Sequence, residues 1–223
     1  HGPRLYQGRV DIIPHHPSTG AIEIAAAPDS HFLPLLHERW EEHKLSSVMI
    51  RDILMYMDRT FVAAQKKKPV YEAALAIFRD EVCRHPRIRE RLLETLLSLV
   101  ARERDGELVP RALVKAIAAG MLVDLSREVY RADFEEPLLR ATAAYYAHES
   151  NETLAQASAS DYMRRVEWRL CEEEERAGNY LDPSSMPRLK EVVERELIAR
   201  HMAALAHMEH SGILAMLEDD KYD

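Results

Sequence analysis

Cysteine, glycine and large aromatic residues are scarce in this sequence of 223 residues, and each shortage excludes a class of protein. The two cysteines, Cys83 and Cys171, lie far apart and form no CxxC pair, so the pattern supports neither a disulfide framework nor a zinc site. Only 7 Gly are present, and Phe and Trp, which are enriched in β-strands, total six. The strong helix formers Ala, Leu, Arg and Glu dominate instead.

Long hydrophobic runs and an excess of positive charge are missing as well. No apolar run approaches the roughly 18 residues of a membrane span, and no signal-peptide core opens the chain, so we expect no membrane association. The formal net charge of -8 argues against non-specific binding of nucleic acid. We therefore expect a soluble protein of the cytoplasm and/or the nucleus. Because the first residue is His1 rather than Met, the chain is expected to be processed or a fragment.

Motifs that carry catalysis are also missing. The sequence has no GxGxxG, no P-loop, no GxSxG and no Glu-x-x-His pair of the kind that di-iron bundles need. His207 and His210 are three residues apart, whereas the zinc-binding HExxH pattern spaces its ligands by four and has a Glu directly after the first His. The acidic run 172–175 follows arginines at helical spacing and indicates a salt-bridged surface. We predict no catalytic residue, no cofactor-binding residue and no metal site.

Helical periodicity runs almost without interruption after residue 30. Apolar residues recur every three to four positions in eight segments, namely 29–40, 45–65, 70–85, 87–104, 110–125, 134–154, 161–180 and 185–217. Their short connections favour antiparallel neighbours, so we expect an all-α helical stack or solenoid. Residues 1–30 are expected to be poorly ordered, because the breaker cluster 14–20 interrupts a segment whose start, Arg4 to Val10, resembles a helix.

The segment 45–65 carries two distinct stripes. Its apolar side is predicted to face the core and consists of Met49, Ile50, Ile53, Met57 and Phe61. A second stripe follows the spacing i, i+4, i+7, i+11 and consists of Asp52, Tyr56, Arg59 and Ala63. Tyr and Arg often anchor protein interfaces, but the spacing alone leaves open whether this stripe is an interface or an ordinary solvated face.

A resemblance to a known family favours the interface. The contiguous block 48–59, VMIRDILMYMDR, resembles the signature segment of the cullin-3 type of cullin proteins. Further blocks similar to the family follow in the same order and comprise Arg39-Trp40 with His43, residues 77–82, 101–107, 129–137, 192–202 and 208–212. The ending Asp220-Lys221-Tyr222 is similar to plant-lineage members.

The resemblance implies both a fold and a function. Cullins are elongated scaffolds of cullin-RING ubiquitin ligases, with a stalk made of five-helix cullin repeats. On this basis residues 1–69 are a partial first repeat, 70–181 the second repeat and 182–223 the start of the third. The cullin-3 type binds BTB-domain substrate adaptors for ubiquitin-dependent protein degradation. The family's contact residues fall on Tyr56 and Arg59, on the same stripe as Asp52.

The sequence also departs from the family. The other adaptor-binding helix, which precedes the family's counterpart of Leu5-Tyr6, is absent, and residues 10–30 match poorly. The C-terminal part that recruits the RING subunit is absent too, so a truncated gene product or an incomplete gene model is expected. The implied role is that of a non-enzymatic scaffold fragment. Two alternatives stay open: a generic helical-solenoid interaction module without a ligase role and, far behind, a helical-bundle enzyme.

Overall fold

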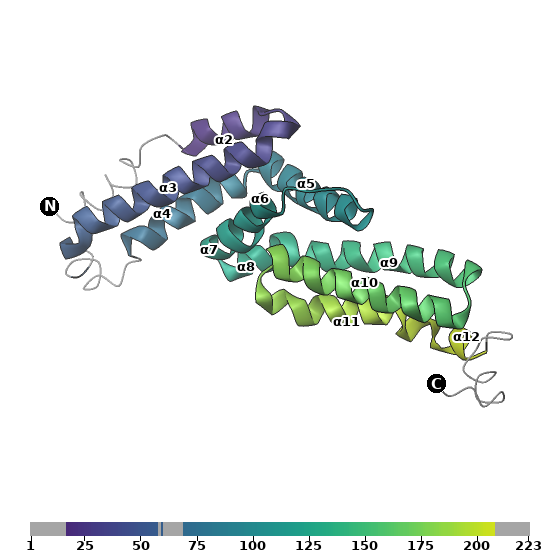
Figure 1. Ribbon diagram of the computed structural model, residues 1–223. Coiled ribbons are helices and arrows are strands. Elements are labelled where there is room, and N and C mark those ends of the chain that lie inside the picture. Colours follow the sequence, from purple (N-terminus) through teal and green to yellow (C-terminus); the bar gives the residue numbers. More distant parts are fainter. Residues whose placement is uncertain (1–16, 58, 60–68, 208–223) are drawn as a thin grey trace. The chain divides into compact units, whose positions relative to one another are not determined.

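A computed structural model describes residues 17–57, 59 and 69–207. Throughout these residues the regular secondary structure is helical and contains no strand (Figure 1). The predicted all-α class is confirmed. The chain divides into two compact units, His1–Tyr130 and Arg131–Asp223. This division falls at neither of the predicted repeat boundaries, 69/70 and 181/182, and the assignment of three repeats stays a prediction.

The first unit begins with a helical hairpin. It consists of α2 (Pro17–Ala26) and the long helix α3 (Asp29–Met57), joined by a short turn in which the His31 amide donates to the Pro28 carbonyl. Residues 17–26 and 29–30, predicted to be poorly ordered, are therefore helical; residues 1–16 lie outside the described part. Pro17 is tolerated because the first residue of a helix has no intrahelical bond to donate. Ala21 and Ile24 of α2 are fully buried, which favours the helical form.

Helix α3 joins two segments that the sequence analysis separated. The prediction of separate helices over 29–40 and 45–65 is wrong, because residues 41–44 contain no breaker and continue the helix. Pro34 lies within it and is exposed.

The remaining elements of the first unit pack against this hairpin. In chain order they are α4 (Val70–Phe78), η2 (Arg79–Cys83), α5 (Pro86–Arg104), α6 (Arg111–Lys115), η3 (Ala116–Leu122), α7 (Val123–Leu125) and α8 (Arg127–Tyr130). Pro86 opens α5, and Gly106, with φ of 89°, makes the turn that follows it.

A cluster of aromatic rings fixes α3 to α4. The rings of Trp40 and Phe78, both buried, are 5.2 Å apart between centroids. His43 lies 5.0 Å from Phe78 and donates from Nε2 to the Ala74 carbonyl at 2.9 Å. Burial lowers the pKa of His43, while the carbonyl acts in the opposite direction. The neutral imidazole therefore connects the two helices.

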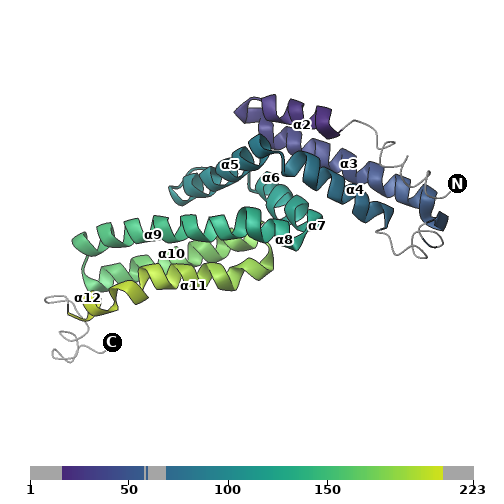
Figure 2. The ribbon, with the colours of Figure 1, turned by 180° about the vertical axis from the view of Figure 1, so that it is seen from behind.

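The second unit is built on three long helices that lie side by side in both views (Figures 1 and 2). They are α9 (Glu136–Gln156), α10 (Ala159–Tyr180) and α11 (Met186–Leu197), preceded by η4 (Arg131–Glu135) and accompanied by η5 (Pro183–Ser185), η6 (Ala199–His201) and α12 (Met202–Ala206). Ser158 caps α10, since its hydroxyl accepts from the Asp161 amide at 3.1 Å. The predicted helix over 185–217 is interrupted after Leu197 by η6, and its residues 208–217 lie outside the described part.

The core of the second unit combines apolar packing with tyrosine hydroxyls. Its buried residues include Tyr146, Tyr162, Val166, Val193 and Leu197. The Tyr162 hydroxyl donates to the Leu197 carbonyl at 2.6 Å, and burial raises the pKa of Tyr162 to about 12. This hydrogen bond connects the C-terminal end of α11 to a buried residue of α10.

The two cysteines differ in environment. Cys83 is buried, as is common for a small apolar residue in a helix. Cys171 is exposed on α10, although its helical segment and apolar character favour burial.

Candidate functional site

The candidate interface stripe runs along the last turns of α3. Asp52 and Arg59 are exposed, as predicted for interface residues. Tyr56 lies in the last turn of the helix, and its side chain is outside the described part, as is the whole of Ala63. Asp52 accepts from its neighbour Arg51 at 2.8 Å, and Arg51 in turn lies over the Tyr71 ring of α4, 5.7 Å from its centroid.

Contacts elsewhere on α3 hold the stripe in place. The helix packs along α4 through Trp40 and His43. Lys44 adds an ion pair with Asp124 of α7 at 2.7 Å, and its ammonium lies 5.8 Å from the centre of the Trp40 ring. The hydrogen bond to Asp124 raises the pKa of Lys44, which favours the charged ammonium. The stripe is thus carried by a helix with fixed position in its own unit, as recognition surfaces require.

The predicted core side of this segment is partly wrong. Met49 and Ile53 are 59% and 79% exposed, and Ile50 is half-buried. Phe61 and the side chain of Met57 lie outside the described part. The reason is the position of the neighbouring helix, because α4 covers the side of α3 that carries His43 and the buried Ser47 instead.

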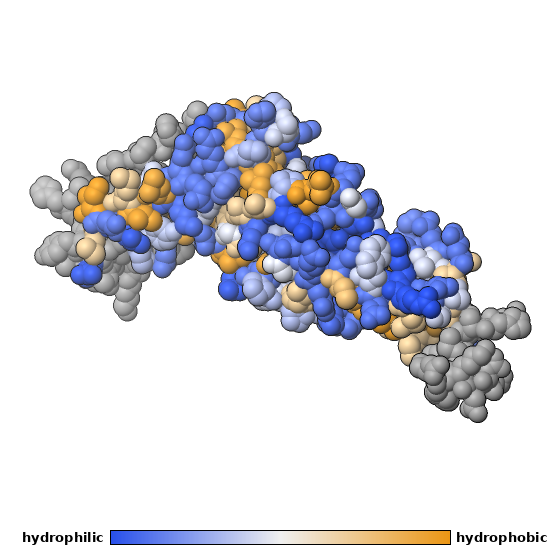
Figure 3. Space-filling view, viewed as in Figure 1, coloured by the Kyte–Doolittle hydropathy of each residue, from blue (hydrophilic) through white to orange (hydrophobic). Residues whose placement is uncertain are grey.

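An apolar surface thus lies beside the stripe, where the sequence pattern predicted a side facing the core. Leu45, 63% exposed, precedes Met49 and Ile53 at steps of four residues, so the three line one side of the helix. Figure 3 shows hydrophobic residues gathered over this part of α3. The four-residue spacing of these apolar residues was visible in the sequence, but a stripe that faces the core has the same spacing. Only the position of α4 shows that this stripe is exposed.

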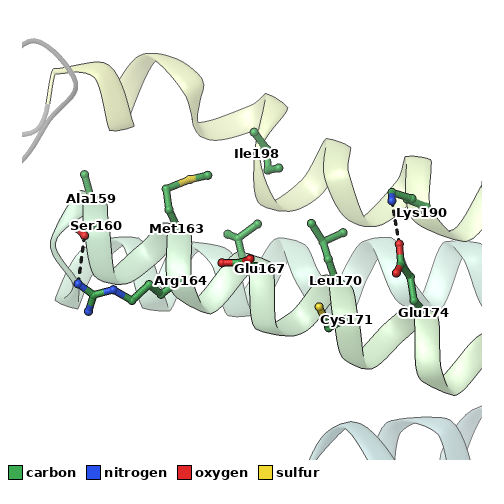
Figure 4. Close-up of a pocket in the computed structure, with 11 residues that line it drawn as sticks. Ala159, Ser160, Met163, Arg164, Glu167, Leu170, Cys171, Glu174, Lys190 and Ile198 are labelled. Carbon is green, nitrogen blue, oxygen red and sulfur yellow. Dashed lines mark hydrogen bonds and ion pairs between the residues drawn. The ribbon is translucent and has the colours of Figure 1, made fainter. Parts of the chain in front are cut away.

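A second surface feature lies in the other unit. A groove of about 650 Å³ runs between α10 and the end of α11, floored by apolar side chains such as Met163, Leu170 and Ile198 (Figure 4). Charged pairs border it, with Lys190 bound to Glu174 at 2.8 Å at one end. The lining offers neither a paired base and nucleophile nor converging carboxylates, so it has the character of a contact surface.

The acidic run on α10 forms salt bridges, as predicted, but the prediction of a surface holds only in part, because Glu173 is buried. Arg169 donates to Glu172 at 2.8 Å and to Glu149 of α9 at 2.7 Å. Arg176 pairs with Glu173. These carboxylates are held by arginines, in an arrangement that stabilises helix packing.

Among the described residues, no three His, Cys, Asp or Glu side chains are gathered closely enough to hold a metal ion. His207 is exposed, and His210 lies outside the described part. No described helix combines the length and the apolar character needed to cross a membrane.

Comparison with known proteins identifies the family. The family model described as "Cullin alpha solenoid domain" matches residues 1–223. The chain belongs to the cullin family. It is 45% identical to Cullin-3 of Dictyostelium discoideum and 44% identical to Cullin-3B of Arabidopsis thaliana, in both cases over 100% of this chain. Cullin-3 of Caenorhabditis elegans is 35% identical.

The cullin-3 type predicted from the signature segment is confirmed by these relatives, whereas human Cullin-4A is 33% identical over 85% of the chain. The chain spans only 29% and 30% of the length of its Dictyostelium and Arabidopsis relatives.

Proposed function

We propose that this chain is the adaptor-binding part of a cullin scaffold in a cullin-RING ubiquitin ligase. Its partner is a BTB-domain protein that brings substrates for ubiquitin-dependent degradation. The observation that carries the proposal is the exposure of Asp52 and Arg59 on the cullin-3 signature segment, at the end of a helix fixed by Trp40 and Lys44.

The chemistry of the stripe suits a protein partner. An arginine and a tyrosine spaced three residues apart can present two broad, partly apolar side chains to one patch, and such residues dominate binding energy in many interfaces. The carboxylate of Asp52 adds a charge that can select a partner of complementary charge.

The chain contributes no chemistry of its own in this proposal. In the proposed complex a RING subunit binds the C-terminal region of a cullin, and these 223 residues span 29% and 30% of the length of the Dictyostelium and Arabidopsis relatives. Ubiquitin transfer is therefore the work of other subunits, and the chain is a scaffold without catalytic residues or cofactors. We place it in the cytoplasm and/or the nucleus, where cullin substrates are degraded.

Calorimetric titration with a BTB-domain dimer tests the proposal. We expect binding by the full chain, and we expect Tyr56→Ala and Arg59→Ala each to weaken it by about 2 kcal/mol, the threshold of an interface hot spot. Leu108→Ala is the matched control, because Leu108 is 98% exposed in the same unit but far from the stripe in sequence. No binding by a folded chain, or equal affinity in all variants, would refute the proposal.

A generic helical interaction module is the second candidate. It is favoured by the apolar groove along α10, which lies in the other unit from the stripe. A partner of this kind would be indifferent to Tyr56→Ala and would lose affinity on Met163→Asp or Leu170→Asp. The same titration therefore separates the two functions.

A further inference from the structure

The carboxylate of Asp52 is held by its neighbour Arg51. The Nε and Nη2 atoms of Arg51 both donate to one oxygen of Asp52, Oδ1, at 2.9 and 2.8 Å. Two donors from one planar guanidinium restrict the carboxylate more closely than a single donor does. Within the residues that the structure describes, no donor reaches the other oxygen, Oδ2. Oδ2 can therefore accept a hydrogen bond from a partner protein.

Arg51 is held in turn by a ring of the neighbouring helix. Its guanidinium carbon lies 5.7 Å from the centroid of the Tyr71 ring of α4, a distance at which a cation and an aromatic face attract each other. Tyr71 is half-buried, and it lies between Val70 and Ala74, which are both buried. A chain of contacts thus runs from the core through Tyr71 and Arg51 to the Asp52 carboxylate.

The stability of the fold does not account for this arrangement. The side chains of Arg51 and Asp52 are 45% and 61% exposed, and ion pairs in such positions contribute little to folding. Consecutive residues of a helix project about 100° apart, so the two side chains meet only because Arg51 turns toward Asp52. The contacts of Arg51 therefore determine the orientation of the carboxylate rather than the stability of the unit.

We propose that Arg51 and Tyr71 are positioning residues of the adaptor-binding stripe. They hold Asp52 in the orientation in which Oδ2 accepts from an N–H or O–H group of the adaptor. A carboxylate that is already ordered loses less rotamer freedom on binding, so more of the contact energy appears as affinity. The inference rests on the proposed function, and it extends the recognition surface from α3 to α4.

A double-mutant cycle tests the positioning role. Calorimetry with a BTB-domain dimer gives the affinity of the parent chain, Arg51→Gln, Asp52→Ala and the double variant. We expect Arg51→Gln to weaken binding about three- to tenfold, the cost of ordering one side chain, and Asp52→Ala to weaken it at least as much. Because Arg51 acts through Asp52, the double variant should bind within about twofold of Asp52→Ala.

Substitutions of Tyr71 distinguish positioning from a general structural effect. Tyr71→Leu removes the ring under Arg51 and should weaken binding about threefold, whereas Tyr71→Phe keeps the ring and should restore the affinity of the parent chain. Urea denaturation of Arg51→Gln should give the same midpoint as the parent chain, because an exposed ion pair contributes little to folding.

Arg79→Gln is the matched control. Arg79 also donates to its neighbour, Asp80, through Nε and Nη2, at 2.8 Å each. It follows Phe78, which contacts Trp40, and Trp40 lies 12 residues or about 18 Å along α3 from Asp52. Removing this equivalent pair should leave adaptor affinity unchanged.

The outcomes separate the positioning role from the proposed function. An equal loss from Arg51→Gln in the parent chain and in Asp52→Ala would overturn the inference, because Arg51 would then contact the adaptor itself. Unchanged affinity in Asp52→Ala or in Arg51→Gln would overturn it too, while a loss in Tyr56→Ala would leave the proposed function standing. A folded parent chain that does not bind the dimer would refute both.

Discussion

At the scale of single residues, buried polar contacts in the second unit determine how well its helices hold together. The Tyr146 hydroxyl donates to Glu173 at 2.6 Å, and Arg176 pairs with the same carboxylate. Both Tyr146 and Glu173 are buried, so each depends on its partners for the hydrogen bonds that water would otherwise supply.

We expect Tyr146→Phe to lower the free energy of unfolding by about 1–3 kcal/mol, because it takes one donor from a buried carboxylate. Urea denaturation followed by circular dichroism measures the change. Tyr145→Phe is the control, since Tyr145 is only half-buried and its contact with Arg169 is long, at 3.5 Å. An equal loss in both variants would mean that the carboxylate contact is unimportant.

His43 should make the first unit sensitive to acid. Burial lowers its pKa below the ordinary 6.5, so the unfolded chain takes up a proton at pH values where the folded chain does not. The free energy of unfolding should therefore fall as the pH drops below about 6.5.

The pH effect can be followed by Trp40 fluorescence in a Trp168→Phe background, which leaves one tryptophan. His43→Gln should flatten the dependence of unfolding on pH between 7 and 5, whereas His148→Gln, on an exposed side chain, should not. An unchanged slope in His43→Gln would assign the acid sensitivity to other groups.

At the scale of elements, the N-terminus of α10 depends on its cap. The Ser158 hydroxyl accepts from the Asp161 amide, one of the donors that a helix start leaves without a backbone partner. Ser158→Ala should cost about 1 kcal/mol in thermal or urea unfolding. Ser160→Ala, two residues further on, should cost clearly less, because its contact with Arg164 is long at 3.4 Å. Equal costs would show that the cap contributes little.

The elements also show how far the sequence could be interpreted. The capped start of α10 and the end of α5 before Gly106 follow from local chemistry, and both were predictable. The exposure of Met49 and Ile53 was not predictable from the sequence. Apolar spacing identifies one side of a helix, but it does not show whether another element covers that side. Many solvated helices share the spacing of the interface stripe, so spacing alone did not identify it. The resemblance of the signature segment to the family pointed to Tyr56 and Arg59 as contact residues.

At the scale of the whole molecule, the two units should respond separately to damage. Phe78 is buried and contacts both Trp40 and His43, so Phe78→Ala removes the aromatic contact between α3 and α4. We expect it to destabilise the first unit by about 3–5 kcal/mol.

Hydrogen exchange with peptide resolution measures this effect. Exchange should accelerate across 17–130 and stay close to that of the parent chain across 131–207. Equal acceleration in both ranges would show that the two units unfold as one.

The fold class was the part of the whole molecule that composition predicted best. Because glycines are few and strong helix formers are many, the composition predicted helices as the regular secondary structure. The structure agrees wherever it describes the chain. The division at Tyr130 was not foreseen, because it depends on which helices contact one another and not on any break in the helical pattern.

The length of α3 has a mechanical consequence. Its 29 residues form one rod about 43 Å long, whose hydrogen bonds lie along the axis. Near its far end it is anchored by Arg91, which lies 4.3 Å from the Phe32 ring and binds Asp29 at 2.5 Å. A force applied at Asp52 is therefore shared along the helix between the contacts of His43 and Lys44 and the contacts of Arg91. We expect a partner bound at this end to dissociate before the helix unfolds.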